Sequence, residues 1–332
     1  MELQTRVEIP DSKVRIDYTR KLAFIGSCFA QNISERFVHL KFNALVNPFG
    51  IIYNPLSINH MIDRIVYQDL YAEKDVQNGT VFLDGENWNC WDFHGAFSCR
   101  DKHLFLDGLN RAIQDANAFL KMTDVVFITL GTAFVYFLQK SGQVVSNCHR
   151  ANPELFQRRL VSVTNVVETL KNVVSNLKTL NPDVKVVFTV SPLRHMKDGT
   201  HGNNLSKSTL LLAVNQVVES CPENVEYFPS YEIVMDELRD YRFYASDMIH
   251  LSDVAEEYIF ERLQETYMDA SARGNLSRVA RFMKSVDHKV VDKASLLHSD
   301  FVQKHIALAE GLETQIAGLD LQSEKQYFLS LQ

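Results

Sequence analysis

The chain has 332 residues, of which 46% are hydrophobic and 23% are charged, a composition typical of globular proteins. Its formal net charge of −7 argues against a nucleic-acid-binding protein, because affinity for a phosphate backbone comes mainly from clustered Lys and Arg. No stretch approaches the ~20 consecutive apolar residues of a membrane-spanning helix, and the polar residues 1–21 lack the pattern of a secretory signal. We therefore expect a cytoplasmic protein that binds neither nucleic acid nor membrane.

The cysteines do not have the pattern of a disulfide framework or of a zinc site. They are Cys28, Cys90, Cys99, Cys148 and Cys221, an odd number without C-x-x-C spacing. Cys148 and His149, together with His195 and His201, provide metal-ligand side chains, but no pair has the spacing of a familiar metal site. We expect no metal and no organic cofactor.

Short apolar runs alternate with helical patterns along residues 22–268, which is typical of a parallel sheet covered by helices. The runs predict five strands, at 22–26, 43–50, 124–131, 183–192 and 224–230. The spacing of apolar residues predicts helices at 29–40, 56–68, 103–120, 160–178, 203–220 and 252–268. The sequence thus predicts an α/β fold with a central parallel five-stranded sheet.

Three segments depart from this alternation. Residues 69–99 predict an aromatic-rich hairpin around Asp84-Gly85, and residues 134–148 predict a second inserted hairpin around Ser141-Gly142. Residues after Gly274 are helical and charged, so we divide the chain into a domain of residues 1–270 and a helical extension of residues 271–332. This extension could join two copies of the chain in a homo-oligomer or bind another partner, or it could pack on its own domain.

Ser27 lies between the first predicted strand and the first predicted helix. In an open α/β sheet, ligands bind at the carboxyl ends of the strands, and helix N-termini stabilise negative charge there. Ser27 is therefore a candidate nucleophile, although serine is also a common helix N-cap. Cys28 is a weaker candidate nucleophile, because a cysteine at a helix start is usually a packing residue.

Asp247 and His250 precede the last predicted helix of the sheet domain. A serine nucleophile needs a base, and the imidazole of that base needs a group that fixes its tautomer. An Asp-x-x-His turn can supply both, which makes Ser27, His250 and Asp247 a candidate triad. The alternative is a solvated aspartate and an unrelated histidine.

Several residues are candidates for an oxyanion hole, the set of donors around a developing alkoxide. The backbone amide of Cys28 lies at a helix start, and Gly50 and Gly131 follow the second and third strands. These glycines could equally be turn residues. The side-chain amides of Asn54 and Asn147 also qualify, and the sequence does not rank them.

Two histidines and a group of aromatic residues are candidates for contact with a substrate. His94 and His195 could provide polar contacts. Four aromatic side chains could stack on a sugar ring or pack within the hairpin: Trp88, Trp91, Phe93 and Phe97.

The arrangement of strand, serine and helix, with a late Asp-x-x-His, resembles the SGNH/GDSL hydrolase superfamily. Within it, "GSCFA" at residues 26–30 resembles the motif of the GSCFA family. Further strings similar to that family lie at residues 47–55, 91–98, 130–136, 147–150, 190–199, 203–210 and 246–252. The resemblance implies a three-layer flavodoxin-like sandwich and ester hydrolysis, with Ser27, Asp247 and His250 in the matching positions.

The chain departs from the superfamily at one catalytic position. Typical members carry Gly-x-Asn-Asp after the third strand, and that asparagine donates to the oxyanion. Here the segment reads Gly131-Thr132-Ala133. Either Asn147 or Asn54 substitutes, or the oxyanion hole relies on backbone amides and Thr132.

Together these features predict a serine esterase that acts through an acyl-enzyme. The resemblance to the superfamily implies a small acyl ester as substrate, such as an O-acylated carbohydrate. One alternative is an O-acyltransferase with the same triad. The other is a non-catalytic module that binds carbohydrate or protein.

Overall fold

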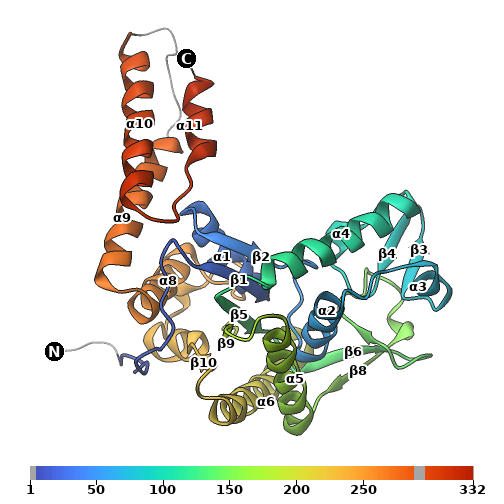
Figure 1. The fold of residues 1–332 in the computed structure, drawn as a ribbon. Helices are drawn as coiled ribbons and strands as arrows, with labels where there is room; N and C mark the ends of the chain where they lie inside the picture. Colours follow the sequence, from blue (N-terminus) through green and yellow to red (C-terminus); the bar gives the residue numbers. More distant parts are fainter. Residues whose placement is uncertain (1–4, 288–295, 332) are drawn as a thin grey trace.

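A five-stranded parallel sheet forms the centre of the fold in the computed structural model, which describes residues 5–287 and 296–331 (Figure 1). Its strands are β1 Lys21–Gly26, β2 Asn43–Val46, β5 Val125–Leu130, β9 Lys185–Val190 and β10 Val225–Tyr227. They lie in the order β10-β9-β5-β1-β2, and each neighbouring pair is parallel. The predicted α/β fold is confirmed. The strand order reverses between β1 and β5, which is where such sheets bind ligands.

Helices cover both faces of the sheet. One face is covered by α2 Pro55–Tyr67, α4 Lys102–Leu120, α5 Val163–Leu180 and α6 Gly199–Ser220, and the other by α1 Cys28–His39 and α8 Asp253–Tyr267. Side chains alternate along a strand, so Ala23 and Ile25 of β1 pack on the first group of helices, and Leu22 and Phe24 pack on the second. Because both faces are covered, the central strands are almost entirely apolar.

Both inserted hairpins are present. β3 Val81–Asp84 pairs antiparallel with β4 Asn87–Cys90, and β6 Phe134–Leu138 pairs antiparallel with β7 Val144–Val145. A further strand, β8 Phe156–Leu160, pairs with the other side of β6 and was not predicted.

The charged sequence of β8 explains why it was missed. Its two arginines reach across to aromatic rings of β6: the guanidinium of Arg158 lies 4.9 Å from the ring centre of Phe134, and that of Arg159 lies 4.1 Å from that of Phe137. These cation–π contacts replace the apolar contacts by which a strand is usually recognised in a sequence.

The C-terminal residues form three helices, α9 Ala270–Val286, α10 Leu296–Gln315 and α11 Gln322–Leu329. They project from the sheet domain as an arm (Figure 1). The base of the arm is held by an ion pair of 2.7 Å between Lys41 and Glu324, and its apolar side chains continue the cluster on the α1–α8 face of the sheet. The helical character of this segment is confirmed, whereas the domain boundary at residue 270 and oligomerisation through the arm stay predictions.

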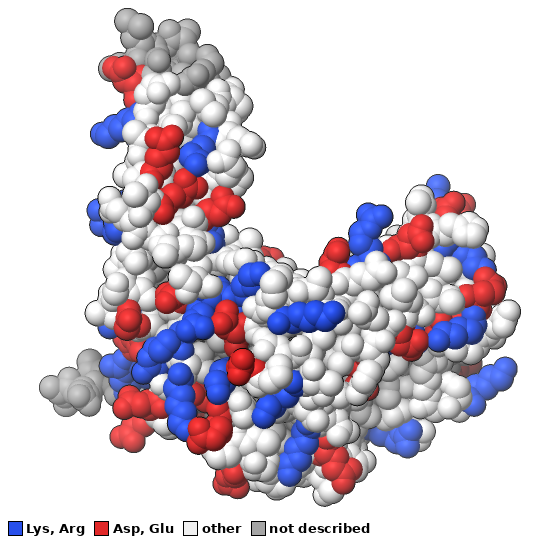
Figure 2. All heavy atoms as spheres, viewed as in Figure 1, with Lys and Arg blue, Asp and Glu red and all other residues white. Residues whose placement is uncertain are grey.

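Charged side chains of both signs are interspersed over the face of the molecule in Figure 2. This mixture agrees with the modest formal charge of −7. Among the described residues, no helix has both the length and the apolar character needed to cross a bilayer.

Gly26→Ala tests the tight junction between β1 and α1. Gly26 has φ +146°, and a Cβ there would lie 2.2 Å from the carbonyl oxygen of Thr129. We expect the substitution to lower the free energy of unfolding by about 2 kcal/mol or more, because it adds backbone strain and a clash with the neighbouring strand.

The measurement is urea unfolding, with Gly108→Ala on the exposed face of α4 as the matched control. Apart from the backbone of its own helix and its chain neighbours, no atom of the described residues lies within 4 Å of a Cβ at Gly108, so this change should be neutral or stabilise by up to about 1 kcal/mol. Equal stabilities of the two variants would contradict the strain at Gly26.

Candidate active site

Ser27 connects β1 to α1 at the carboxyl edge of the sheet. It has extended backbone geometry at the N-cap position of α1, but its side chain makes no capping hydrogen bond. The residue is only 2% exposed, and among the described residues its Oγ has no hydrogen-bond partner. A buried hydroxyl without a partner is unusual and calls for an explanation. Capping, the alternative use of this serine, does not provide one.

Asn47 holds the junction that positions Ser27. Its Oδ1 accepts a hydrogen bond of 2.8 Å from the Gly26 amide, and its Nδ2 donates to Gln31 Oε1 at 2.8 Å. Asn47 is buried and has φ 40°, a left-handed conformation that asparagine tolerates better than most residues. We did not predict this role. The signal in the sequence was an asparagine before Pro48, directly after a strand.

Asp247 and His250 form the pair that their spacing predicts. Asp247 Oδ2 lies 2.6 Å from His250 Nδ1, and Asp247 Oδ1 accepts hydrogen bonds of 2.9 Å from the amides of Ile249 and His250. The bond from His250, followed by those two amides, lowers the pKa of Asp247 to about 2. A carboxylate at Nδ1 places the ring proton there and leaves Nε2 as the basic nitrogen.

The pair and the serine are not joined in this conformation. The side chains of His250 and Asp247 are 49% and 46% exposed, whereas Ser27 is buried. In the described part of the chain Ser27 Oγ has no partner, so it does not hydrogen-bond to His250. A general base must come within roughly 2.6–3.2 Å of the hydroxyl that it deprotonates. Two of the three predicted residues are thus in contact, and the third lies at the sheet edge.

The amides of both candidate glycines have partners. The Gly50 amide donates to the carbonyl of Asn47 at 2.7 Å, and the Gly131 amide donates to the carbonyl of Tyr53 at 2.7 Å. Neither amide is available to an oxyanion without breaking these bonds.

Thr132 and Asn54 also make local bonds. Thr132 Oγ1 lies 2.9 Å from Ser206 Oγ, and it accepts a hydrogen bond from the Phe134 amide. Asn54 caps α2: its Oδ1 accepts from the Ser57 amide and its Nδ2 donates to Ser57 Oγ, both at 2.9 Å. The cap explains the position of Asn54 without an oxyanion role.

Asn147 and His94 make turns in the inserted regions. Asn147 Oδ1 accepts from the His149 amide at 2.8 Å, and His94 Nδ1 accepts from the Ala96 amide at 3.3 Å. His94 also lies against Gly50, where a Cβ would come within 2.3 Å of the histidine Cβ. The structure therefore gives both residues a local structural function.

Cys28 begins α1, and its own amide belongs to the first turn, where amides have no intrahelical partner. Burial is the main influence on its thiol and raises the pKa, so the thiol stays protonated near neutral pH. Of the predicted backbone donors, the Cys28 amide is the one best placed beside Ser27.

His195 follows β9 and has a partly buried imidazole. Its ring stacks on that of Tyr53, with centroids 5.1 Å apart and an interplanar angle of 24°. Its Nε2 is buried and, within the described residues, has no hydrogen-bond partner. Burial, followed by the positive charges of Lys207 and Arg158, lowers the pKa of His195 to about 4, so the ring is neutral at pH 7.

Lys207 of α6 is buried beneath the same edge. Its Nζ donates to the carbonyls of Gly131 at 2.7 Å and Ser191 at 2.6 Å, and so joins the ends of β5 and β9. Burial, followed by the charge of Arg194, lowers its pKa to about 7. We did not predict this residue, because a lysine in a helical sequence normally faces solvent.

The aromatic residues of the first hairpin mainly pack on other rings. Trp91 stacks on Phe82 and Phe93 stacks on Phe49, each pair with centroids 3.8 Å apart. Trp91 and Phe93 are buried, so the structure favours packing over sugar stacking for these two residues.

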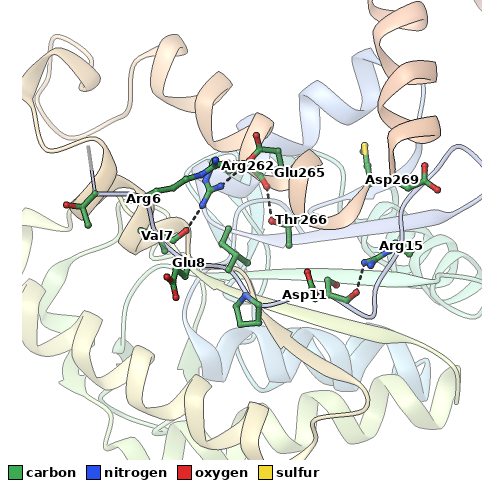
Figure 3. A pocket seen from close by; sticks show the side chains of 14 residues that line it. Arg6, Val7, Glu8, Asp11, Arg15, Arg262, Glu265, Thr266 and Asp269 are labelled. Carbon is green, nitrogen blue, oxygen red and sulfur yellow. Dashed lines mark hydrogen bonds and ion pairs between the residues drawn. The ribbon is translucent and has the colours of Figure 1, made fainter. Parts of the chain in front are cut away.

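A separate hollow of about 1340 Å³ lies beside the segment that leads into β1, between residues 5–15 and the end of α8 (Figure 3). Arg262, which lines this hollow, already has partners: it donates to the Val7 backbone carbonyl at 2.6 Å and pairs with Glu265 at 3.0 Å. Ser27 follows the opposite end of β1, so this hollow is not part of the candidate active site. In residues 5–287 and 296–331, no cluster of three or more His, Cys, Asp or Glu side chains could hold a metal ion.

Lys207→Met tests the buried charge. The pKa of Lys207 is about 7 in the folded chain against 10.5 ordinarily, so between these pH values the unfolded chain binds a proton that the folded chain has released. Stability therefore rises with pH in this window, by at most about 1.4 kcal/mol per pH unit. The free energy of unfolding of both proteins is measured by urea titration at pH 7 and at pH 9. We expect the value for the unsubstituted protein minus the value for Lys207→Met to be larger at pH 9. A pH-independent difference would mean that Lys207 titrates at its ordinary pKa.

The solved structures that are similar to this chain include the following three. The first is an acetyl xylan esterase (Est2A) from the rumen bacterium Butyrivibrio proteoclasticus, at 14% identity and a TM-score of 0.40, with 75% of this chain and 63% of that chain covered. The second is the periplasmic domain of a lipopolysaccharide acetyltransferase from Salmonella ser. Paratyphi A, at 11% identity and a TM-score of 0.35, with 74% and 83% covered. The third is a family two carbohydrate esterase from Clostridium thermocellum in complex with cellohexaose, at 16% identity and a TM-score of 0.35, with 79% and 65% covered. The matched region thus spans less than two thirds of either esterase chain.

No curated protein matches the chain. The sequence model of the GSCFA family matches residues 21–263, which is most of the chain and includes Ser27, Asp247 and His250. This match confirms the resemblance carried by the GSCFA string at residues 26–30. The chain therefore belongs to the GSCFA family.

Proposed function

We propose that this protein is a serine esterase in which Ser27 is the nucleophile, His250 the general base and Asp247 the residue that orients His250. The observation that carries the proposal is the buried hydroxyl of Ser27 between β1 and the N-terminus of α1, which has no hydrogen-bond partner in the described part of the chain. The Asp247–His250 bond of 2.6 Å supports it, because it supplies an oriented base.

In the first half of the reaction, Ser27 Oγ forms a bond to the carbonyl carbon of the ester while His250 Nε2 takes the serine proton. The carbonyl π electrons move onto the oxygen, where the Cys28 amide donates a hydrogen bond. When this intermediate collapses, the bond to the alcohol breaks and His250 gives its proton to the leaving alcohol. In the second half, water loses a proton to His250 and attacks the acyl-enzyme, which releases the acid and returns the proton to Ser27.

Asp247 stays ionised throughout this cycle at neutral pH, because its pKa of about 2 lies well below that pH. It stabilises the imidazolium that forms at His250 and keeps the proton on Nδ1. The cycle also requires Ser27 and the half-exposed His250 to come into hydrogen-bond contact, by movement of the loop that carries Asp247 and His250 or of the residues around Ser27.

The substrate class that we propose is an O-acylated carbohydrate or a similar small acyl ester, as in the superfamily that the sequence resembles. Acyl transfer to a hydroxyl is the second candidate reaction. The observation that favours it is the burial of Ser27, since a site that excludes water protects an acyl-enzyme from hydrolysis until another alcohol enters.

Labelling with a fluorophosphonate probe tests the triad, because an activated serine displaces fluoride from phosphorus and becomes covalently modified. We expect the unsubstituted protein to be labelled and Ser27→Ala to be unlabelled. His250→Ala should be labelled about 10²-fold or more slowly, the usual contribution of a general base, and Asp247→Asn should also be slowed.

His103→Ala is the matched control, because His103 is an exposed histidine on α4 and its loss should leave the labelling rate unchanged. No labelling of the folded, unsubstituted protein would refute the serine-esterase proposal and favour a binding module. If the protein is labelled, a screen of ester substrates with and without an added sugar acceptor would separate hydrolysis from acyl transfer.

A further inference from the structure

The candidate active site lacks an obvious side-chain donor for the oxyanion. The segment after β5 reads Gly131-Thr132-Ala133 and contains no amide side chain. The Gly131 amide is hydrogen-bonded to the Tyr53 carbonyl, and the Thr132 hydroxyl is hydrogen-bonded to Ser206. Removing one oxyanion donor from a serine hydrolase typically costs 10²–10³-fold in rate, so the absence of a donor would be a large defect.

The imidazole of His195 lies against the backbone at this position. A Cβ on Gly131 would come within 3.1 Å of His195 Nε2 and 2.8 Å of the ring of Tyr53. Both contacts are tighter than real side chains normally make, so the close approach of the two rings explains why residue 131 is glycine. The nitrogen that faces this glycine is the buried Nε2 without a partner.

The register of the sheet brings Gly131 and Ser27 to the same edge. Gly26 of β1 pairs with Thr129 of β5. Ser27 comes one residue after Gly26, and Gly131 comes two residues after Thr129, so both lie just beyond this pair. This is also the point where the strand order reverses and ligands are bound in such sheets. Gly131, the residue that His195 Nε2 faces, therefore lies at the same edge of the sheet as Ser27.

The position of His195 is fixed before any substrate binds. Its backbone amide donates to Asn203 Oδ1 at 3.0 Å, and its ring stacks on Tyr53. Asn203 is itself buried on α6, so the loop after β9 is tied to a helix. A donor that is already oriented loses little freedom when charge develops, which is the condition for effective oxyanion stabilisation.

Burial is the main reason for His195 to remain uncharged, and the charge of Lys207 adds to it. Lys207 Nζ binds the carbonyl of Gly131, the residue that His195 faces, and its positive charge opposes protonation of the imidazole. A neutral imidazole with its proton on Nε2 can donate one hydrogen bond there.

We propose that His195 Nε2–H donates a hydrogen bond to the carbonyl oxygen of the substrate ester as that oxygen becomes an oxyanion. His195 thereby takes the place of the asparagine that the segment at Gly131 lacks, and acts together with the Cys28 amide. The proton stays on Nε2 throughout, and Ser27 and His250 perform the bond and proton transfers described above. This inference rests on the proposed function.

The test compares two substitutions of His195, with p-nitrophenyl acetate as the probe substrate. His195→Phe keeps a ring that can stack on Tyr53 but removes the donor, and His195→Gln restores a side-chain N–H donor. We expect kcat to fall about 10²–10³-fold in His195→Phe, with KM changed less than about 3-fold, and to recover to within about 10-fold in His195→Gln.

A second readout separates a catalytic from a structural role. Phenylboronic acid forms a tetrahedral adduct on an active serine, and one of its oxygens occupies the oxyanion position. Its inhibition constant should rise in His195→Phe in parallel with the loss of kcat, while thermal unfolding and KM stay close to those of the unsubstituted protein. A folded His195→Phe variant with unchanged kcat and boronate affinity would overturn the inference.

Failure of the inference and failure of the proposed function give different results. If the unsubstituted protein is labelled by the fluorophosphonate and His195→Phe retains its full kcat, only the role of His195 is wrong. If the unsubstituted protein is neither labelled nor active on p-nitrophenyl acetate, the serine-esterase proposal is wrong and the role of His195 falls with it.

Discussion

The site depends on the close approach of two neighbouring strands where β1 ends. The backbone of Gly26 passes so near Thr129 that no side chain fits between them. Gly26 can take the required backbone conformation without strain. Asn47 stabilises this conformation, because its Oδ1 accepts a hydrogen bond from the Gly26 amide. The chain then turns directly into α1, so the residue after the glycine is held at the carboxyl edge of the sheet, next to helix amides. That residue is Ser27.

A buried lysine fixes the neighbouring part of this edge. The two carbonyl bonds of Lys207 favour its charged form, and bonds to a charged group contribute roughly 1.5–3 kcal/mol each. Removing an ammonium group from water costs several kcal/mol, and burial, followed by the charge of Arg194, lowers the pKa of Lys207 to about 7. Lys207 is therefore costly to bury. Shifted buried groups of this kind concentrate at functional sites, and its position under Gly131 agrees with such a role.

The sequence was sufficient for the sheet because buried parallel strands are nearly continuous apolar runs, as in β5 and β9. It was also sufficient for Asp247 and His250, because the two are close in the chain and one turn brings them together. It was insufficient wherever a role depends on contacts between distant segments. The bond from Gly131 to Tyr53 and the bonds of Lys207 to two strand ends are examples.

The same reasoning applies to the candidate donors. Gly50, Gly131, Thr132 and Asn54 were reasonable choices by residue type and position, but in the fold each of them already forms a hydrogen bond to another protein group. From the sequence, His195 was considered as a metal-ligand side chain and as a polar substrate contact, and no specific catalytic role was predicted for it. Its unpartnered Nε2 and its approach to Gly131, a residue 64 positions earlier in the chain, depend on the packing of the loop after β9 against the end of β5. No local pattern in the sequence contains that information.

The loop with Asp247 and His250 is built so that the pair can move as one unit. Its hydrogen bonds are mostly internal: the Ala245 amide donates to the His250 carbonyl at 2.8 Å, and the Met248 amide donates to the Ala245 carbonyl at 2.9 Å. The amides of Ile249 and His250 bind Asp247 in the same turn. A displacement of this turn toward Ser27 would therefore preserve the orientation of the imidazole, which is the costly part of a catalytic dyad to assemble. The main free-energy cost of moving this turn onto Ser27 would then be the desolvation of the half-exposed His250 and Asp247. Contacts with an ester bound between His250 and Ser27 would offset that cost.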